Sequence, residues 1–461
     1  MPITPLIQLV SVGQVDQYLS LTPQLSYFKY VAKRHTRFAL DNLKLNFDST
    51  TIPRLGNSEN ICIKKIERHG DLLTNLSLVL RIPEINSDKN LRFRWIDNYA
   101  TLLVKKAEIF VGSQGIAINS LYGEWMVIWN ELTLTPEKKY KYNLTTGNTS
   151  DSLNPTRENK IITVTKNNNL QYQYYPENPS IKSKQVIIPL PFYFTKNPAL
   201  AIPLCALQTN EVILRIEFEN VEKLYQIYDK DYDNKIENAK GKYVSSQYYN
   251  NKYKTNISIN NFVKSEQLDL DAHIEAQYVY LNETERKLIT VNRRNNQFLV
   301  ENIYKKSTDT NSISTNINLD LNTPVKEIIW VLKDTESNNN FNLNTTYTYD
   351  NKDILKTAKI LWNRSNERVE EKDAIFFNKL QPYLHHSSIP KPGIYCYSFG
   401  LNPEKWQSTG YYNPGGRFSI STSILFNIDN DLNGRSFNVD IYVLQYNIFE
   451  IIGGVGGFKF S

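Results

Sequence analysis

Cysteine and methionine are scarce in this chain of 461 residues, which holds three cysteines and two methionines. Cys62, Cys205 and Cys396 lie far apart and are odd in number, so they do not have the pattern of a disulfide-rich scaffold. We therefore expect each cysteine to be a small buried apolar side chain in a reducing compartment.

The first twenty residues do not have the pattern of a targeting signal, and the chain has no long uninterrupted apolar run. The first twenty residues have no cationic start and already contain Asp16. The longest uncharged runs are interrupted by Pro198 and Pro203 and are shorter than the roughly 20 residues that span a bilayer. The net charge of +6 is small for this length, and no dense Lys/Arg tract is present. We expect a soluble intracellular product with no direct, specific nucleic-acid binding.

The motifs of common enzyme classes are missing. The chain has no G-x-S-x-G, no G-x-x-x-x-G-K-[ST], no H-E-x-x-H and no C-x-x-C. The Gly-rich stretch 453–458 is not followed by the Lys-Ser/Thr of a phosphate-binding loop, and Glu370 and Glu371 lie in a charged run typical of a solvated surface. We predict that the protein is not an enzyme, with no catalytic residue, no cofactor-binding residue and no cofactor.

Histidine spacing gives no metal site either. A strand presents metal ligands at positions i and i+2, whereas His385 and His386 are adjacent and would point to opposite faces. His35, His69 and His273 have no histidine two residues away. The spacing therefore weakens the hypothesis of a metal-dependent, cupin-like enzyme, and we predict no metal ligands.

One acidic stretch resembles half of a calcium loop. The segment 429–434 reads DNDLNG, and Asp440 stands at the twelfth position. Predicted strands flank the segment where helices would be required, and Asp, Asn and Gly also favour tight turns for backbone reasons. We interpret the stretch as a hairpin turn.

Strand patterns dominate what is present. Aromatic residues make up 12% of the chain, a content that favours strands. In EVILRIEF, the side chains of Val212, Leu214, Ile216 and Phe218 alternate with polar ones, which predicts a half-buried strand. The same period of two or an apolar run predicts strands at 61–67, 76–82, 102–111, 273–280, 327–333 and 437–443.

Helix patterns are few. The segment 121–132 has apolar residues at helical spacing, with Glu124 and Glu131 expected on its outer face. Asn282 followed by Glu285 has the spacing of a capping box and predicts one short helix.

The patterns divide the chain into two β halves. Each half closes on an alternating strand, near Asn220 and near Ile451. The stretches 136–185 and 229–262 are polar and are expected to be long loops. We predict an all-β fold of two consecutive antiparallel eight-stranded jelly-roll β-sandwiches with a few short helices in inserted loops. The expected divisions are an N-terminal arm (1–24), a first domain (25–220) and a second domain with a Gly-rich tail (221–461).

The segment 190–220 combines aromatic residues, prolines and an alternating strand. Its prolines prevent a regular helix or ladder. We expect Phe192, Tyr193, Phe194 and Leu200 to be buried, either in the core of their own chain or against a neighbouring subunit.

A family resemblance rests on motifs that occur in one order along the chain. The stretch LPFYFTKNPALAIPLCALQTNEV (190–212) resembles the segment that joins the late strands of the first jelly roll in major capsid proteins of nucleocytoplasmic large DNA viruses. The chain departs from the family pattern at 413–419, where NPGGRFS replaces the usual Asn-x-Ser-Arg. Further stretches that resemble family landmarks are 6–39, 122–133, 278–287, 324–332, 381–410 and 446–461.

The resemblance implies a structural role. Three chains would form a trimeric, pseudo-hexagonal capsomer, and capsomers would tile the icosahedral shell of a double-stranded DNA virus assembled in host cytoplasm. The implied partners are two further copies, neighbouring capsomers, minor capsid and penton proteins, and an underlying internal membrane. The arm 1–24 carries one charge, Asp16, and is expected on the inner face or under a neighbour.

Two other functions are compatible with the same patterns. One is a scaffold protein of the same fold, similar to that of poxviruses, which forms a transient lattice on immature virion membranes. The other is a glycan-binding jelly-roll protein, in which exposed Tyr and Trp side chains stack on sugars.

Overall fold

The computed structural model describes residues 3–30, 32–47, 53–56, 60–87, 91–112, 117–155, 162–166, 169–173, 179–232, 241–291, 296–343, 345–362, 366–415, 421–432 and 434–459. The chain separates into two compact units, residues 1–38 and 39–461. The first unit contains two short helices, α1 (Ile3–Val10) and α2 (Gln14–Ser20), whose side chains are all exposed. No described helix is long and apolar enough to cross a membrane.

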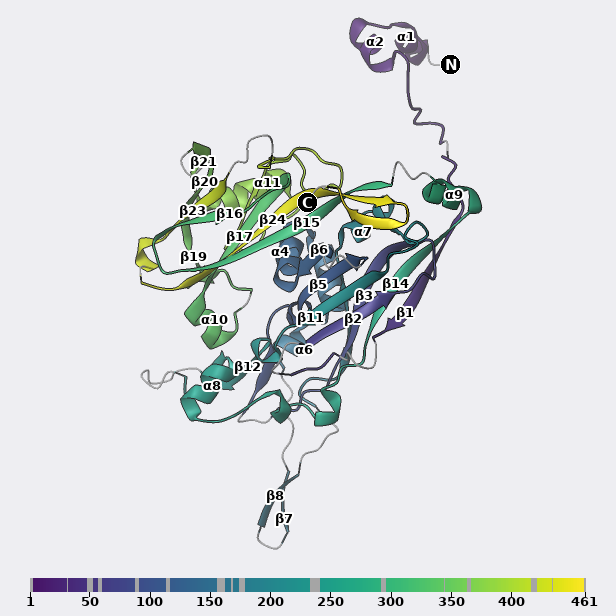
Figure 1. Cartoon of the computed structure of the whole chain (residues 1–461). Helices are drawn as coiled ribbons and strands as arrows, with labels where there is room; N and C mark the ends of the chain where they lie inside the picture. The colour runs from purple at the N-terminus through teal and green to yellow at the C-terminus, as the bar shows by residue number, and fades with distance from the viewer. Residues whose placement is uncertain are drawn as a thin grey trace. The chain divides into compact units, whose positions relative to one another are not determined.

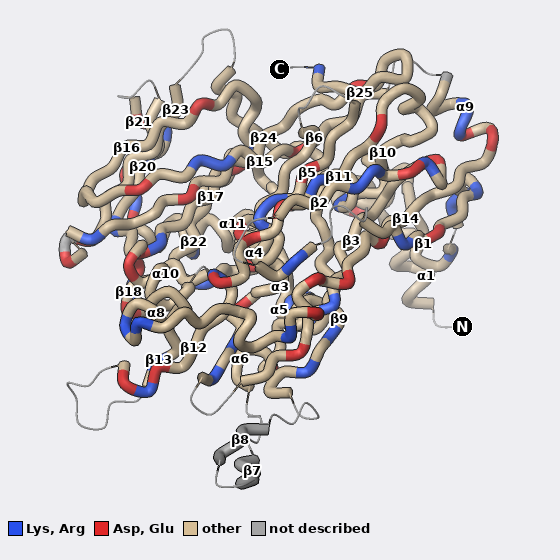
Figure 2. The backbone as a smooth tube through the Cα atoms, turned by 60° about the horizontal axis from the view of Figure 1, so that its bottom comes forward, with Lys and Arg blue, Asp and Glu red and all other residues tan. Residues whose placement is uncertain are grey.

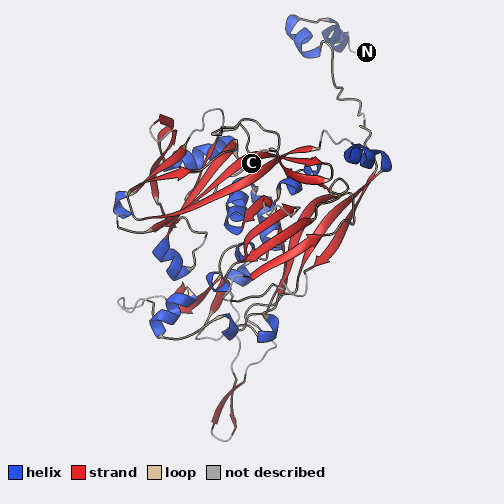
Figure 3. Cartoon of the chain, in the orientation of Figure 1, coloured by secondary structure: helices blue, strands red, loops and turns tan. Residues whose placement is uncertain are grey.

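The second unit is built mainly of antiparallel sheets, as Figures 1 and 3 show. Its N-terminal part is a β-sandwich of a five-stranded and a four-stranded sheet. The five-stranded sheet has the order β1-β14-β3-β10, with β9 also paired to β3, and the four-stranded sheet has the order β2-β11-β5-β6. The strands are β1 (Phe38–Asn46), β2 (Asn60–Ile66), β3 (Leu72–Ile82), β5 (Val104–Val111), β6 (Ala117–Tyr122), β9 (Lys184–Pro189), β10 (Ile202–Pro203), β11 (Val212–Phe218) and β14 (Ala272–Leu281).

The C-terminal part is a second β-sandwich of the same kind. Its sheets have the orders β15-β24-β17-β22, with β25 paired to β24, and β16-β23-β20-β21. The count of eight strands per sandwich stays a prediction. The short strands β10 and β25 belong to the two five-stranded sheets, so the count depends on whether they are taken as part of each jelly roll. The strands are β15 (Gln297–Thr310), β16 (Ser314–Leu319), β17 (Val325–Asp334), β20 (Leu355–Trp362), β21 (Asn366–Asp373), β22 (Ile394–Ser398), β23 (Thr422–Ile428), β24 (Phe437–Ile452) and β25 (Val455–Phe458).

Helices and small sheets occupy the connections. A three-stranded sheet has the order β13-β12-β4, and β7-β8 and β18-β19 are hairpins. The expected loops at 136–185 and 229–262 therefore contain regular elements, while 233–240 lies outside the described residues. The elements are β4 (Phe93–Trp95), β7 (Ile162–Lys166), β8 (Asn169–Gln173), β12 (Tyr225–Asp229), β13 (Lys242–Val244), β18 (Thr348–Tyr349), β19 (Lys352–Asp353), α3 (Tyr99–Leu103), α4 (Gly123–Thr133), α5 (Pro136–Thr145), α6 (Ser150–Leu153), α7 (Tyr193–Lys196), α8 (Ser246–Tyr253), α9 (Glu283–Val291), α10 (Thr335–Phe341), a π-helix (Phe376–Leu380) and α11 (Gln381–His385).

The strand Ala272–Leu281 lies in the sequence range that was expected to form the second domain. This strand, β14, pairs with β3 from Ala272 opposite Leu80 to Val279 opposite Leu72. It therefore belongs to the first sandwich, although the sequence placed it in the second domain. A period-two pattern shows that a strand has a buried face but not which sheet provides its neighbours.

The helix predicted at 121–132 begins two residues late. Leu121 and Tyr122 are the last residues of β6, and α4 starts at Gly123. A Cβ atom at Gly123 would lie 2.2 Å from the carbonyl oxygen of Val104, so glycine allows the chain to turn tightly from strand to helix against β5. The short helix predicted after Asn282 is confirmed as α9, and Asn282 Oδ1 accepts a hydrogen bond from the Glu285 backbone at 2.9 Å.

Two central strands of the second sandwich are buried on both faces. Ile328, Trp330 and Leu332 of β17 point into the core of that sandwich, whereas Ile329 and Val331 join the larger core that includes the first sandwich. The expected half-buried strand at 327–333 is therefore a fully buried one. The apolar run EIIWVL has no polar alternation because neither face meets water.

The segment 190–220 contributes many of its apolar side chains to this shared core. Phe192, Tyr193, Phe194 and Leu200 are all buried in the single chain, which confirms the first of the two expected locations. The rings of Phe192 and Phe194 stack with centroids 5.6 Å apart. The alternation predicted for Val212–Phe218 is also confirmed, since every second side chain of β11 is buried.

Replacing a ring of this core should be costly. We expect Phe194→Ala to lower the free energy of unfolding by about 3–5 kcal/mol, because it removes a fully buried ring and leaves a cavity. Leu288→Ala is the control, since Leu288 is 62% exposed on α9 and should change stability by less than about 0.5 kcal/mol. Urea unfolding followed by fluorescence measures both, and equal shifts would contradict the core location.

Candidate functional site: the seam between the sandwiches and the exposed apolar surface

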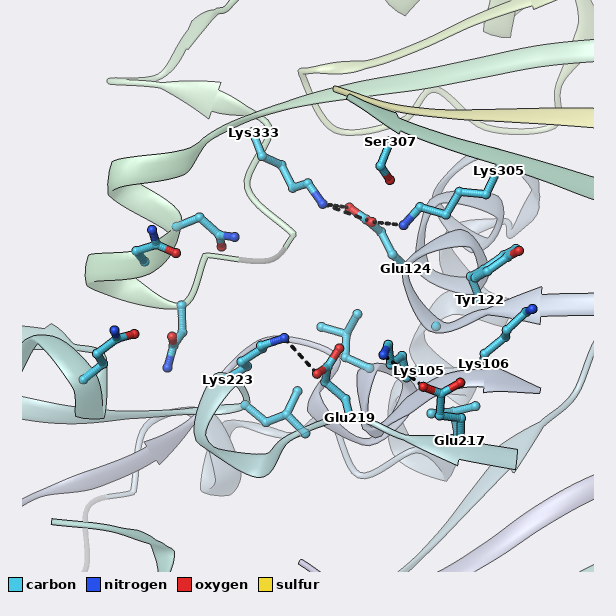
Figure 4. Close-up of a pocket in the computed structure, with 18 residues that line it drawn as sticks. Lys105, Lys106, Tyr122, Glu124, Glu217, Glu219, Lys223, Lys305, Ser307 and Lys333 are labelled. Atoms are coloured by element: carbon cyan, nitrogen blue, oxygen red, sulfur yellow. Dashed lines mark hydrogen bonds and ion pairs between the residues drawn. The ribbon is translucent and has the colours of Figure 1, made fainter. Parts of the chain in front are cut away.

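A cleft of 610 Å³ lies between the two sandwiches. Figure 4 shows lysines and glutamates from both sandwiches pointing into it. The first sandwich contributes the start of α4 and residues of β5 and β11, and the second contributes residues of β15, β17 and α10. The cleft therefore marks the seam where the sandwiches meet.

The charges at the mouth of the cleft are paired locally. Lys105 Nζ lies 2.9 Å from a carboxylate oxygen of Glu217, and Lys223 Nζ lies 3.0 Å from one of Glu219. The described residues that line the cleft include no histidine and no cysteine.

A buried ion cluster lies deeper in the seam. Lys333 Nζ of β17 is 2.6 Å from Asp440 Oδ2 of β24 and 3.0 Å from Glu124 Oε1 of α4. Lys305 Nζ lies 3.5 Å from Asp440 Oδ1, and the Tyr442 hydroxyl donates to Glu124 Oε2 at 2.8 Å. Two carboxylates and two ammonium groups thus neutralise one another across the seam.

The environment shifts the pKa of each acid in this cluster in a different direction. Burial raises the pKa of Glu124, and the neighbouring Asp440 charge adds to the rise while Lys333 opposes it. Burial alone would also raise the pKa of Asp440, but the charges of Lys333 and Lys305 hold it well below its usual range. Asp440 is therefore the charged partner that compensates Lys333 most directly.

Glu131 is buried and Glu124 has a side chain that is only 12% exposed, so the expectation that they face outward is wrong. Glu131 is 7% exposed and accepts from Lys139 at 2.6 Å. Helix α4 lies between the two sandwiches and has no broad solvent-facing side. The signal in the sequence was the run WMVIW, which is apolar all round and typical of a buried helix.

Polar contacts also join the sandwiches elsewhere along the seam. Lys196 Nζ, just after the aromatic residues of α7, lies 2.9 Å from Glu301 of β15. Asn119 Nδ2 donates to the Glu301 carbonyl oxygen at 2.6 Å, and Glu301 also pairs with Lys326. Asn342 Nδ2 donates to the Tyr225 carbonyl oxygen at 2.5 Å. These contacts fix the register of one sandwich on the other.

The histidines are placed very differently from one another. His386 is buried between Glu327 and Glu404, whereas His385 ends α11 with its Nδ1 3.1 Å from the Leu401 carbonyl oxygen. His69 lies 2.9 Å from Glu67, and His273 is on β14. Neither His385 nor His386 is in a strand, so the spacing of ligands along a strand does not decide whether this pair can bind a metal.

The acidic stretch before β24 and the three cysteines are the remaining features that the sequence singled out. Within this stretch Asn430–Leu432 form a short 3-10 turn between β23 and β24, and Asp440 is bound to Lys333. The stretch is therefore a turn, but not the expected hairpin, because β23 and β24 belong to different sheets. Cys62 and Cys396 are buried as expected, while Cys205 is half-buried, and none is in a disulfide. The predictions that the chain has no catalytic and no cofactor-binding residues stay predictions.

Large apolar side chains are exposed on one stretch of the second sandwich. The stretch follows β21 and includes the π-helix, α11 and the loops after them. Apolar groups exposed together mark contact surfaces more often than chance exposure does. The exposed residues are Ile375, Leu380, Tyr383, Leu384, Ile389, Leu401 and Tyr411.

Comparisons with known proteins agree with this architecture. A family model described as the major capsid protein N-terminus matches residues 26–282, and one described as the large eukaryotic DNA virus major capsid protein matches residues 279–457. This chain belongs to the major capsid proteins of large eukaryotic DNA viruses. The family predicted from the ordered motifs is thereby confirmed.

Similar capsid proteins match the chain from end to end. The major capsid protein of Pyramimonas orientalis virus is 28% identical over 99% of both chains. Probable capsid protein 4 of Acanthamoeba polyphaga mimivirus is 25% identical over 99% of both. The scaffold, glycan-binding and cupin-like alternatives are not favoured by these relatives.

Solved structures support the double jelly-roll fold. The VP54 protein of PBCV-1 has a TM-score of 0.68 at 19% identity, over 95% of this chain and 100% of that one. The Faustovirus major capsid protein also has a TM-score of 0.68, at 11% identity, over 96% and 94%. Two antiparallel jelly rolls in one chain are therefore the fold of this capsid protein.

The ion cluster provides a test of the seam. Lys333→Met leaves Glu124 and Asp440 with only the more distant Lys305, so we expect a loss of about 3–5 kcal/mol of stability. Adding Asp440→Asn should recover part of it by removing one uncompensated charge. Thermal unfolding measured by calorimetry compares the three proteins, and we expect the wild type to be the most stable, the double variant intermediate and Lys333→Met the least stable.

Lys372→Met is the matched control. Lys372 pairs with Glu370 at 3.3 Å on β21, where both side chains are exposed. Its loss should cost no more than about 1 kcal/mol, as is usual for surface pairs. A Lys333→Met protein as stable as this control would show that the buried cluster is not needed.

Proposed function

We propose that this chain assembles as a homotrimer into pseudo-hexagonal capsomers that tile the icosahedral shell of a large double-stranded DNA virus. The observation that carries the proposal is the side-by-side fusion of two jelly rolls through a shared core, in a chain of the major capsid family. Three such chains supply six sandwiches, the number that a hexagonal outline requires.

The distribution of charge fits a role in contact with protein. Lys, Arg, Asp and Glu are interspersed along the backbone in Figure 2. A shell subunit of this kind is held to its neighbours by buried apolar area more than by a charged stripe. The apolar stretch 375–411 is the surface that we assign to contact with another copy.

The N-terminal unit supports the same role. Most of its apolar side chains are more than half exposed, with Leu9 at 77% and Tyr18 at 89%. Exposure of so many apolar groups is costly in water, so a partner should cover them. We infer that the arm, residues 1–24, lies on the inner face of the shell or under a neighbouring capsomer.

We infer partners beyond the trimer from the same reasoning. An arm that faces inward would contact the partners on the inner side of the shell, namely minor capsid proteins, penton proteins and an underlying internal membrane. We propose assembly in host cytoplasm, where the three unpaired cysteines remain reduced. The two matched family regions meet at 279–282, at the end of β14, and we place the division between the jelly rolls there.

The oligomeric state tests the assigned surface. We expect the purified chain to elute as a trimer in size-exclusion chromatography with light scattering. Leu384→Glu and Leu401→Glu place charges on exposed apolar positions and should shift the population toward the monomer. Leu288→Glu, at a similarly exposed position on α9, should leave the trimer unchanged. A wild-type protein that is monomeric under all conditions would contradict the trimer itself.

Deletion of residues 1–24 tests the arm separately. The truncated protein should remain a soluble trimer, because the surface that we assign to contact with another copy lies in the second unit, but its yield of closed particles should fall. Electron microscopy of particles from matched expressions measures the yield. Normal particle numbers from the deletion would exclude a role of the arm in assembly.

A further inference from the structure

Three side chains able to bind a metal meet at the seam, outside the cleft of Figure 4. The groups are Glu327 on β17, Cys396 on β22 and His386 just after α11, and their ligand atoms all lie within 4.8 Å of one another. The side chains of Glu327 and His386 are fully buried, and Cys396 is 1% exposed. This is the only such grouping of three among the described residues.

The strand register explains how the first two ligands come together. In the antiparallel pair β17–β22, Ile329 is opposite Cys396 and Glu327 is opposite Ser398. Residues two apart in a strand share a face, so Glu327 and Cys396 are diagonal neighbours on one face. Ile329 and Cys396 belong to the shared core, so this is the face that looks toward the first sandwich.

The third ligand is held over that face by contacts with α4. The ring of His386 meets Trp129 edge-on, with centroids 6.0 Å apart. The backbone N–H of Ser388 donates to the Leu132 carbonyl oxygen at 3.0 Å. His386 therefore sits where the second sandwich touches the helix that belongs to the first.

A further carboxylate orients the imidazole. Glu404 Oε1 lies 3.2 Å from His386 Nδ1 and also accepts from the Ser387 backbone N–H at 2.6 Å. With Nδ1 engaged in this way, Nε2 is directed toward Glu327, whose Oε1 is 2.6 Å away. Metal-bound histidines usually have such a carboxylate on the nitrogen that does not touch the metal.

One buried ligand atom has no partner. Glu327 Oε2 makes no hydrogen bond, although it is shielded from solvent. A buried carboxylate oxygen left without a partner is costly and calls for an ion or a donor. This atom is the observation, separate from the clustering, that points to a bound cation.

We propose that Glu327, His386 and Cys396, which all belong to the second jelly roll, bind a zinc ion on the face of that jelly roll that looks toward the first. A thiolate and an imidazole favour zinc over magnesium or calcium, and three protein ligands of mixed N, S and O type suit a tetrahedral ion. Ligand atoms around tetrahedral zinc are roughly 3.3–3.8 Å apart, a spacing that these groups reach with small side-chain shifts.

A proton competes with zinc for this position. Without metal, Nε2 donates to Glu327; burial alone would lower the pKa of His386, but the neighbouring carboxylates raise it to about 12. Burial raises the pKa of the Cys396 thiol to about 11. Zinc binding forms bonds to Nε2, Sγ and a Glu327 oxygen, and it releases the His386 and Cys396 protons to solvent.

The test uses the full-length protein purified without chelators. Elemental analysis should give about one zinc per chain. Cobalt(II) exchanged into the protein should produce a thiolate-to-cobalt charge-transfer band and the visible spectrum of a tetrahedral ion. Prolonged treatment with a chelator should lower the thermal unfolding midpoint, and added zinc should restore it.

Cys396→Ser should lose the charge-transfer band, and Cys205→Ser is the matched control that should keep it. If Cys396→Ser does not fold, the zinc content and the cobalt spectrum of the wild-type protein alone test the proposal. Wild-type protein with no zinc above the buffer blank and no cobalt band would overturn the proposal and leave a proton-bridged cluster. A band that survives in folded Cys396→Ser would place the metal elsewhere and overturn it equally.

Discussion

The burial of β17 and β24 on both faces is the constraint on which the rest of the structure depends. One face of each strand fills the core of the second jelly roll, and the other face packs on the first. Because apolar area removed from water is the main favourable term in folding, this arrangement makes the seam part of the core. The cleft, the ion cluster and the buried histidine all lie along this shared layer.

The polar groups of the seam are positioned by that apolar layer. Lys333 and Asp440 belong to the doubly buried strands, and they meet Glu124 because α4 is wedged between the sandwiches. Glu327 and His386 meet against the same helix. Buried charges of this kind contribute specificity of register more than net stability, since their desolvation cost is high.

Sequence patterns predicted the fold where local periodicity decides it. The alternation of β11, the capped start of α9 and the burial of Phe192 and Phe194 all follow from residue spacing and composition. Order along the chain then pointed to the capsid family. The same patterns did not predict the pairing of β14 with β3, because this pairing is a long-range property that no local spacing encodes.

The seam could not be predicted in the same way. Glu124 was assigned to an outer face because a helix with charged residues usually has one, and His386 was tested only against neighbours along a strand. Their partners Lys333 and Glu327 lie far away in sequence, so only the tertiary structure brings the groups together.

The burial of β17 and β24 on both faces also limits whether the two jelly rolls can exist as separate proteins. A second jelly roll expressed alone would present Ile329, Val331, Tyr442 and Leu444 as a bare apolar sheet face. Such a face invites aggregation, so neither half is a module that can be moved to another chain unchanged. Substitutions in the connecting loops should therefore be tolerated more readily than substitutions along this layer.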